Sequence, residues 1–195
     1  MTDKIKPWKM ISERTIFEKF GRGIKKTVFQ QADGEQINVY LKKERDVVSV
    51  LPITDKKEII MVKQFRPGPR MITLDLPGGI IDSEKVNLEK ATATIKKELL
   101  EETGYKGELK FVTTVIEDGY SSKLKYTFVA TNCKKIKEVS NDLRDNDDDG
   151  EMGFKEEKEV VLVSLKEFKA LLRLGKFADV QVGYLGLDYL KLLCG

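Results

Sequence analysis

The chain of 195 residues contains no histidine. Without an imidazole, neither a Ser-His-Asp nor a Cys-His nucleophile can form, and zinc or non-haem iron sites with histidine ligands are excluded. Acid-base and metal chemistry must therefore rest on carboxylates and lysines. Oxygen ligands of this kind favour hard cations such as Mg²⁺ or Mn²⁺.

Cysteine and long apolar runs are also scarce. The two cysteines, Cys133 and Cys194, are far apart and form no CxxC pair, so we expect free thiols rather than a disulfide framework or a zinc site. No apolar run approaches the roughly 18 residues that cross a bilayer. The lysine-rich start, Met1 to Met10, lacks the apolar core of a signal peptide. We therefore expect a cytoplasmic protein with no membrane partner.

No charge of one sign dominates. The 35 basic and 32 acidic side chains are mostly interleaved, which argues against the clustered basic face of a nucleic-acid-binding protein. Hydrophobic residues make up 41% of the chain, enough for one well-formed core.

The first third of the chain has the pattern of short strands separated by turns. Between Glu13 and Phe65, β-rich runs alternate with turn signals at 20–23, 33–34 and 54–57. The most apolar runs, 47–51 and 59–62, are predicted to lie in the core. Lys63, Gln64 and Arg66 then emerge at a strand end, and the Pro-Gly-Pro at 67–69 stops that strand.

The remainder alternates between helical and extended patterns. A helix is predicted from about Asn87, its N-cap, to Thr103, with Gly104 as its stop. Strands are expected near 109–115, 125–130 and 160–163, and an acidic segment from about 132 to 159 is predicted to be a long loop. Ser164 and Glu167 have the spacing of a capping box, opening a helix to about Leu174, and a final helix is expected over roughly 180–193.

Three glutamates of the first helix share one face. Glu98, Glu101 and Glu102 fall within about a third of the helix circumference at 100° per residue. Like charges at these spacings destabilise a helix unless something neutralises them, and a divalent cation would do so. The alternative is a solvated acidic stripe paired with lysines. The flanking Pro77-Gly78-Gly79 and Gly104-Tyr105 favour the metal site.

The segment from Gly79 to Tyr105 resembles the Nudix box, G-x5-E-x7-R-E-U-x-E-E-x-G-U, in which U is a bulky apolar residue. Six positions of its second half match: Glu98, Leu99, Glu101, Glu102, Gly104 and Tyr105. Lys97 stands where the family has arginine, which keeps the charge but loses the bidentate fork. Counting back from the helix, Glu89 occupies the first glutamate position, and four extra residues fall within Asp82 to Asn87.

This resemblance implies an α/β fold, a Nudix α/β/α sandwich with a mixed sheet over residues 46–195, preceded by a β-rich extension over 1–45. It implies that Glu98 and Glu102 bind Mg²⁺, with Mn²⁺ as a substitute, together with the backbone carbonyl of Gly78. Glu101 adds or supports a ligand. A general base is expected from the acidic loop among Glu151, Glu156, Glu157 and Glu159, and alignment on the following strand favours Glu156 or Glu157.

Two further segments, 62–67 and 74–79, are similar to ADP-ribose and other nucleotide-sugar pyrophosphatases of the family. The resemblance implies that Arg66 contacts the diphosphate and that Asp75 faces the substrate. Lys123 stands where this branch usually has a glutamate that touches the terminal ribose, so a different distal sugar is an open alternative. The branch commonly forms homodimers by exchanging N-terminal strands, and Trp8 is the candidate for stacking on the base.

The expected reaction is hydrolysis of a nucleoside diphosphate sugar, ADP-ribose foremost, to AMP and ribose 5-phosphate. The alternatives are a hydrolase of GDP- or UDP-sugars or of dinucleoside polyphosphates, and a Nudix sensor that binds a nucleotide without cleaving it. The three helix glutamates argue against the sensor, because a pure binder has no need to tolerate their repulsion.

Overall fold

The computed structural model describes residues 5–83, 85–139, 142–144, 155–175 and 177–193. The chain divides into two compact units. The first comprises Met1–Arg45 together with Ile116–Leu124, and the second comprises Asp46–Val115 and Lys125–Gly195. The segment 116–124 therefore belongs with the N-terminal residues, which a division of the sequence at residue 45 does not capture.

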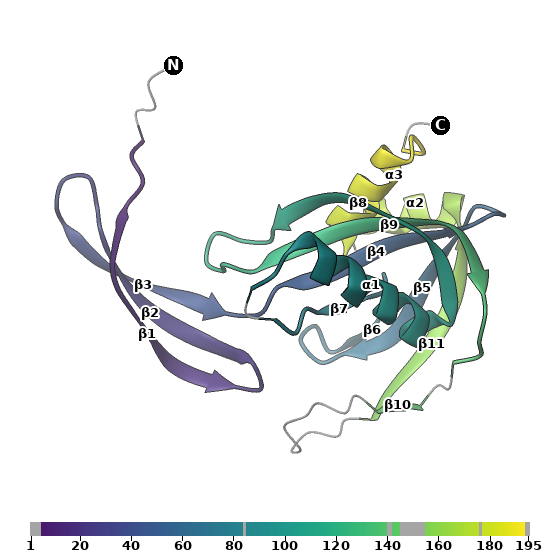
Figure 1. Ribbon diagram of the computed structural model, residues 1–195, viewed down its shortest axis with the longest axis horizontal. Coiled ribbons are helices and arrows are strands. Elements are labelled where there is room, and N and C mark those ends of the chain that lie inside the picture. The colour runs from purple at the N-terminus through teal and green to yellow at the C-terminus, as the bar shows by residue number, and fades with distance from the viewer. Residues whose placement is uncertain (1–4, 84, 140–141, 145–154, 176, 194–195) are drawn as a thin grey trace. The chain divides into compact units, whose positions relative to one another are not determined.

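The first unit is built on a three-stranded antiparallel sheet in the order β1-β2-β3 (Figure 1). Its strands are β1 (Lys9–Lys19), β2 (Arg22–Gln30) and β3 (Gln36–Lys43). The predicted turns are confirmed: Phe20 and Gly21 have positive φ between β1 and β2, and Gly34 does between β2 and β3. The edge strand β1 is exposed at every residue.

The second unit contains a mixed sheet in the order β10-β11-β5-β4-β9-β8, with β6 paired to β5 and β7 paired to β4. Strands β4 and β9 are parallel, whereas β4 pairs antiparallel with β5. The strands are β4 (Val47–Thr54), β5 (Glu58–Arg66), β6 (Met71–Asp75), β7 (Gly78–Ile80), β8 (Tyr105–Ile116), β9 (Leu124–Lys135), β10 (Asp142–Arg144) and β11 (Lys155–Ser164).

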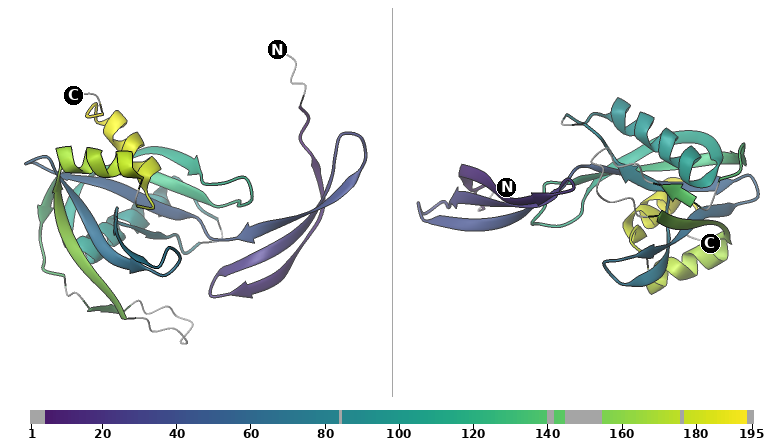
Figure 2. Two further views of the ribbon diagram at one scale, coloured as in Figure 1. Left: turned by 180° about the vertical axis from the view of Figure 1, so that it is seen from behind. Right: turned by 90° about the horizontal axis from the view of Figure 1, so that it is seen from below.

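Helices cover both faces of this sheet, which confirms the α/β architecture with three layers. The helices are α1 (Leu88–Thr103), α2 (Leu165–Leu174) and α3 (Val180–Tyr189). Helix α1 packs on β4, β5, β7 and β11, while α2 packs on β5 and β11 and α3 packs on β4. Figures 1 and 2 show α1 on one side of the sheet and the other two helices on the opposite side. No described helix is long and apolar enough to span a membrane.

The alternating side chains of the central strands build one core on each face. Val48 and Val50 of β4 pack with Ile95 and Leu99 of α1. Leu51 of the same strand belongs to the other core, which α2 and α3 close. Cys133 is a buried free thiol in the α1 core, and burial raises its pKa to about 12. Cys194, the other cysteine predicted to be a free thiol, lies outside the described residues.

The residues predicted to begin and end α1 do so in the structure, as do those predicted to begin α2. Asn87 Oδ1 accepts a hydrogen bond from the backbone N–H of Lys90 at 2.9 Å, and Gly104 ends α1 in the left-handed conformation with a φ of 76°. Both hydrogen bonds of the Ser164–Glu167 capping box are present at the start of α2. The start of α1 therefore follows directly from the sequence, as does the direction in which its glutamates project.

Two predicted boundaries are wrong. The last helix ends at Tyr189 instead of extending to about 193. The segment 132–159 is not one long loop, because β9 continues to Lys135, β10 forms a short strand, and β11 begins at Lys155. The charged start of β11 lacks an apolar period, but its backbone pairs with β10 over 155–157 and with β5 from Lys158 onward. The exposed Lys63 and Glu159 form a cross-strand ion pair of 2.9 Å. Glu151 lies outside the described residues.

Candidate active site

The two glycines before α1 bring the chain backbone against the glutamates of that helix. Gly78 pairs with Ser49 of β4, and its N–H donates to Glu102 Oε2 at 3.0 Å. A Cβ on Gly78 would lie 2.3 Å from the carbonyl oxygen of Val48, and one on Gly79 would lie 2.5 Å from Glu98 Cδ. Glycine at position 78 therefore allows the close approach of β7 to the backbone of β4, and glycine at position 79 leaves room for the Glu98 carboxylate beside the backbone.

Glu102 is the most buried of the three helix glutamates, with 8% of its surface exposed. Its Oε1 accepts from Lys158 Nζ of β11 at 3.0 Å, while Oε2 accepts from Gly78. Burial raises the pKa of Glu102 above its ordinary value, whereas the Lys158 ammonium and the Gly78 N–H favour the charged form. No local sequence pattern indicates Lys158, which β11 places beside α1.

The other two glutamates lie differently. Glu98 is one helical turn before Glu102, is half-buried and packs its carboxylate against Gly79. Glu101 is exposed and lies 3.7 Å from Lys97 in an i,i+4 ion pair. The structure therefore brings Glu98, Glu102 and Gly78 together and leaves Glu101 toward solvent. Among the described residues, no three carboxylates or cysteines are already gathered around one point as metal ligands.

A second group of polar side chains lies where β5 and β6 pair. Asp75 is fully buried, and its Oδ2 accepts from Arg66 Nε at 2.6 Å, Gln64 Nε2 at 3.1 Å and Thr73 Oγ1 at 3.0 Å. Its Oδ1 has no hydrogen-bond partner within the part of the chain that the structure describes. The Arg66 side chain is 41% exposed. Asp75 thus contacts Arg66 from the protein interior, while the guanidinium reaches solvent.

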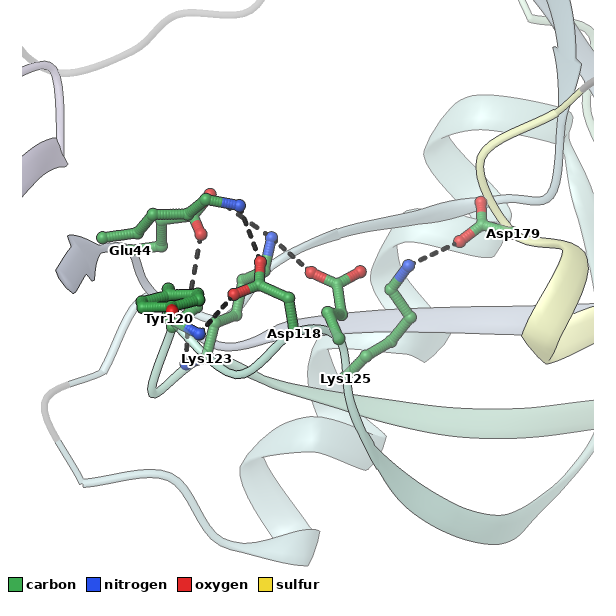
Figure 3. Close-up of polar contacts among 9 residues, drawn as sticks. Glu44, Asp118, Tyr120, Lys123, Lys125 and Asp179 are labelled. Carbon is green, nitrogen blue, oxygen red and sulfur yellow. Dashed lines mark hydrogen bonds and ion pairs between the residues drawn. The ribbon is translucent and has the colours of Figure 1, made fainter.

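The positive charge of Arg66 also acts on two other carboxylates. It favours the charged forms of Glu102 on α1 and of Asp179, the residue before α3. Asp179 caps no helix with its side chain; instead its Oδ1 accepts from Lys125 Nζ of β9 at 3.0 Å, as Figure 3 shows. Burial raises the pKa of Asp179, and Lys125 opposes that effect. No local sequence pattern indicates this buried pair, because its members are 54 residues apart.

A groove of about 500 Å³ lies along β5, β6 and β11. Its lining residues are Lys63, Gln64, Phe65, Ile72, Glu157, Lys158 and Glu159. Glu157 is exposed, and the strand alternation puts it out of phase with Lys158, which faces Glu102. Position 156 is in phase with Lys158 and pairs with Leu143 of β10; the side chain of Glu156 lies outside what the structure describes.

The two predicted site residues of the first unit are placed as follows. Lys123 Nζ lies 3.4 Å from Glu44 Oε1 and 2.5 Å from Glu117 Oε2, and only 17% of its side chain is exposed. Figure 3 shows Lys123 and Glu44 beside Asp118, which lies 2.6 Å from the Lys42 ammonium. Trp8 is 47% exposed, with its ring 6.1 Å from that of Phe29. Lys123 therefore holds the segment 116–124 to the end of β3.

Comparison with known proteins identifies the family. Residues 43–181 match the NUDIX domain, and the chain belongs to that family. It is 29% identical to the ADP-ribose pyrophosphatase of Bacillus subtilis (strain 168) over 152 residues, which are 77% of this chain and 74% of that protein. It is 41% identical to the ADP-sugar pyrophosphatase of Mus musculus over 71 residues, 34% of this chain and 31% of that protein.

The fold is shared with a solved structure as well. The crystal structure of an ADP compounds hydrolase superposes with a TM-score of 0.72, covering 97% of both chains at 17% sequence identity. The likeness at this identity concerns the fold. It extends over the N-terminal sheet as well as the α/β domain, so the predicted Nudix architecture with a β-rich extension is confirmed.

Proposed function

We propose that the protein is a metal-dependent hydrolase of nucleoside diphosphate sugars that acts on ADP-ribose, releasing AMP and ribose 5-phosphate. The observation that carries the proposal is the convergence of Glu98 and Glu102 on the Gly78-Gly79 backbone. Arg66 lies within electrostatic range of the same site. Carboxylates and a cationic guanidinium are the groups that pyrophosphate hydrolysis requires.

The residues present fit a hard divalent cation. Two carboxylates one helical turn apart and a backbone carbonyl are oxygen ligands of the kind Mg²⁺ and Mn²⁺ prefer. Glu98, Glu102 and the carbonyl of Gly78 would hold the ion, and Glu101, exposed one residue away, would support it through water. When bound, the ion would neutralise charge on the diphosphate and on the attacking oxygen.

The protein's own residues bind and orient the substrate. Arg66 presents guanidinium N–H groups toward solvent, and these donate to the non-bridging oxygens of the diphosphate. Asp75 does not touch the substrate in this proposal; it holds Nε of Arg66 from the interior. Water attacks one phosphorus, the bridging P–O bond breaks, and the departing oxygen remains on the other phosphate, so that a monophosphate and a sugar phosphate leave.

Of the two loop carboxylates expected to act as general base, the proposal favours Glu156. Position 156 is in phase with Lys158, whose ammonium reaches Glu102, whereas Glu157 is out of phase with Lys158 and exposed. A base must reach the water that attacks the phosphorus, which requires it on the glutamate side of the sheet. Glu156→Gln should therefore slow turnover more than Glu157→Gln.

The N-terminal unit supports the proposed homodimer. Among the described residues β1 pairs on one edge only, with β2; it is exposed throughout and carries the apolar side chains of Met10, Ile11, Ile16 and Phe17. Such an edge is normally covered. A second copy of the chain would cover it, and Trp8 would stack on the base. Light scattering should give a dimer mass, and Ile16→Lys should lower it; a monomer at every concentration would refute this part.

The test of the reaction is AMP release from ADP-ribose with Mg²⁺, with EDTA as the metal-free control. Glu102→Gln should reduce the rate by on the order of 10²-fold or more, because it removes a charged ligand. The matched control is Glu108→Gln, which changes an exposed strand glutamate bound to Asn132. A GDP- and UDP-sugar panel run in parallel would identify another nucleotide-sugar substrate, and stable binding without turnover of any would indicate a sensor instead.

A further inference from the structure

Lys158 occupies the place beside Glu102 that the proposed function gives to a metal ion. Its Nζ lies 3.0 Å from Glu102 Oε1, and about 10% of each side chain is exposed. The other carboxylate oxygen accepts from Gly78. Both oxygens of the most buried glutamate are thus already engaged, one of them by a cation that belongs to the chain.

The position of Lys158 in β11 is one where an apolar residue is expected. Val160, in phase with it on the same strand, packs against the α1 core. A lysine at such a position is rare unless a carboxylate pairs with its ammonium, because an unpaired charge is costly to bury. The strand pairing sets Lys158 opposite Gln64 of β5, so the side chain is held on the helix side of the sheet. The charge of Lys158 therefore has its counterpart in Glu102.

We propose that Lys158 is a built-in competitor of the divalent cation. Its ammonium neutralises Glu102 when the metal is absent, and it must leave Oε1 before a metal ion binds there. A metal–oxygen bond of about 2.1 Å would bring the ion close to an ammonium that remained in place, and the two positive charges would repel. The inference rests on the proposed metal site and adds that this site is tuned to bind bare metal weakly.

The decisive variant is Lys158→Met, which keeps most of the length of the side chain and removes its charge. The matched control is Lys63→Met, since Lys63 also forms a cross-strand ion pair between β5 and β11, with Glu159 at 2.9 Å. The measurement is the dissociation constant of Mn²⁺ alone, from the paramagnetic resonance signal of free Mn²⁺. Lys158→Met should bind at least about tenfold more tightly than the unchanged protein, and Lys63→Met within about twofold of it.

The outcomes separate this inference from the proposed function. If Lys158→Met binds Mn²⁺ as tightly as the unchanged protein or more weakly, Lys158 is not a competitor of the metal. The metal site would still be supported in that case if Glu102→Gln abolished Mn²⁺ binding. Absence of Mn²⁺ binding in every variant overturns both.

A measurement on the unchanged side chain guards against a variant that does not fold. In protein labelled with ¹³C at the lysine ε carbon, Lys158→Arg, which keeps the charge, assigns the Lys158 signal. Titration with Mg²⁺ should move that signal toward the position of a solvated lysine and leave the Lys63 signal in place. A Lys158 signal that does not move at saturating Mg²⁺ overturns the proposal.

Discussion

Nε of Arg66 lies 2.6 Å from Oδ2 of Asp75, and of these two residues only the arginine reaches solvent. The pair is therefore asymmetric. Asp75 fixes one edge of the guanidinium from inside the protein, together with Gln64 and Thr73, which share the same oxygen. The remaining N–H groups of Arg66 are directed by a charge that a ligand cannot displace, because Asp75 is fully buried.

Asp75→Asn should weaken this orientation without emptying the site. The amide keeps nearly the same shape but loses the charge that holds Arg66, and small displacements of positioning groups cost on the order of 10²-fold in rate. We expect kcat/KM for ADP-ribose to fall by about that factor, with a higher KM. Asp118→Asn serves as control, because Asp118 forms an ion pair of the same 2.6 Å on the surface. An unchanged kcat/KM in Asp75→Asn would show that Arg66 needs no support.

The buried pair of Lys125 and Asp179 should matter for stability. Each side chain is 11% exposed, so removing one partner leaves a buried charge without its ion-pair partner. Lys125→Met should lower the free energy of unfolding by about 3–5 kcal/mol, and a compensating Asp179→Leu in the same chain should recover much of it. Urea unfolding measures both.

A surface pair at the end of the same strand, β9, supplies the comparison for that experiment. Lys135 lies 2.7 Å from Glu138, and both side chains are largely exposed. Lys135→Met should leave the urea midpoint unchanged because solvent screens such a pair. If Lys125→Met behaved like Lys135→Met, the buried pair would contribute nothing to α3 docking.

The parts of the site that sequence predicts are those encoded locally. Asn87 and Gly104 mark the ends of α1, and the helical period then fixes which glutamates share a face. The period does not distinguish Glu101 from Glu102, which differ by one residue yet are exposed and buried, respectively. That difference involves β11, which places Lys158 beside Glu102 although the two residues are 56 positions apart in the chain.

Local sequence patterns do not predict pairing between strands that are distant in the chain. The first five residues of β11, 155–159, are all charged, so their pattern resembles a solvated loop. Their backbone nevertheless pairs with β10 over 155–157 and with β5 from Lys158 onward, because backbone hydrogen bonds form whatever the side chains are. Distance along the chain also hides one partner of Lys123. Glu44 lies 79 residues away in sequence, whereas Glu117 is a near neighbour.

Gly79→Ala should test whether the glutamate cluster needs close backbone contact. The added Cβ would lie 2.5 Å from Glu98 Cδ, at the end of a flexible side chain that can move aside. The metal ligand would shift while the fold is retained, so we expect Mn²⁺ affinity to fall by about tenfold or more with little change in the urea midpoint.

Gly68→Ala is the control for that substitution, since a Cβ there meets no atom within 4 Å. It should leave Mn²⁺ binding as it is. Unaltered Mn²⁺ affinity in Gly79→Ala would mean that Glu98 holds no metal in the position described.

The segment 116–124 should loosen in acid. The Lys42 ammonium and the Tyr120 N–H lower the pKa of Asp118 below its ordinary value of 3.8, so the charged form is favoured in the folded state. The stabilisation is present above pH 3.8 and is lost as the pH falls below that value through the folded pKa. Amide hydrogen exchange of residues 118–123 should therefore speed up at low pH, relative to its intrinsic rate, before the β1–β3 sheet opens. Lys42→Met removes the largest cause of the shift and should move the loosening to higher pH; identical profiles for the two proteins would assign the acid response to another group, since Lys42 would then have no effect on Asp118.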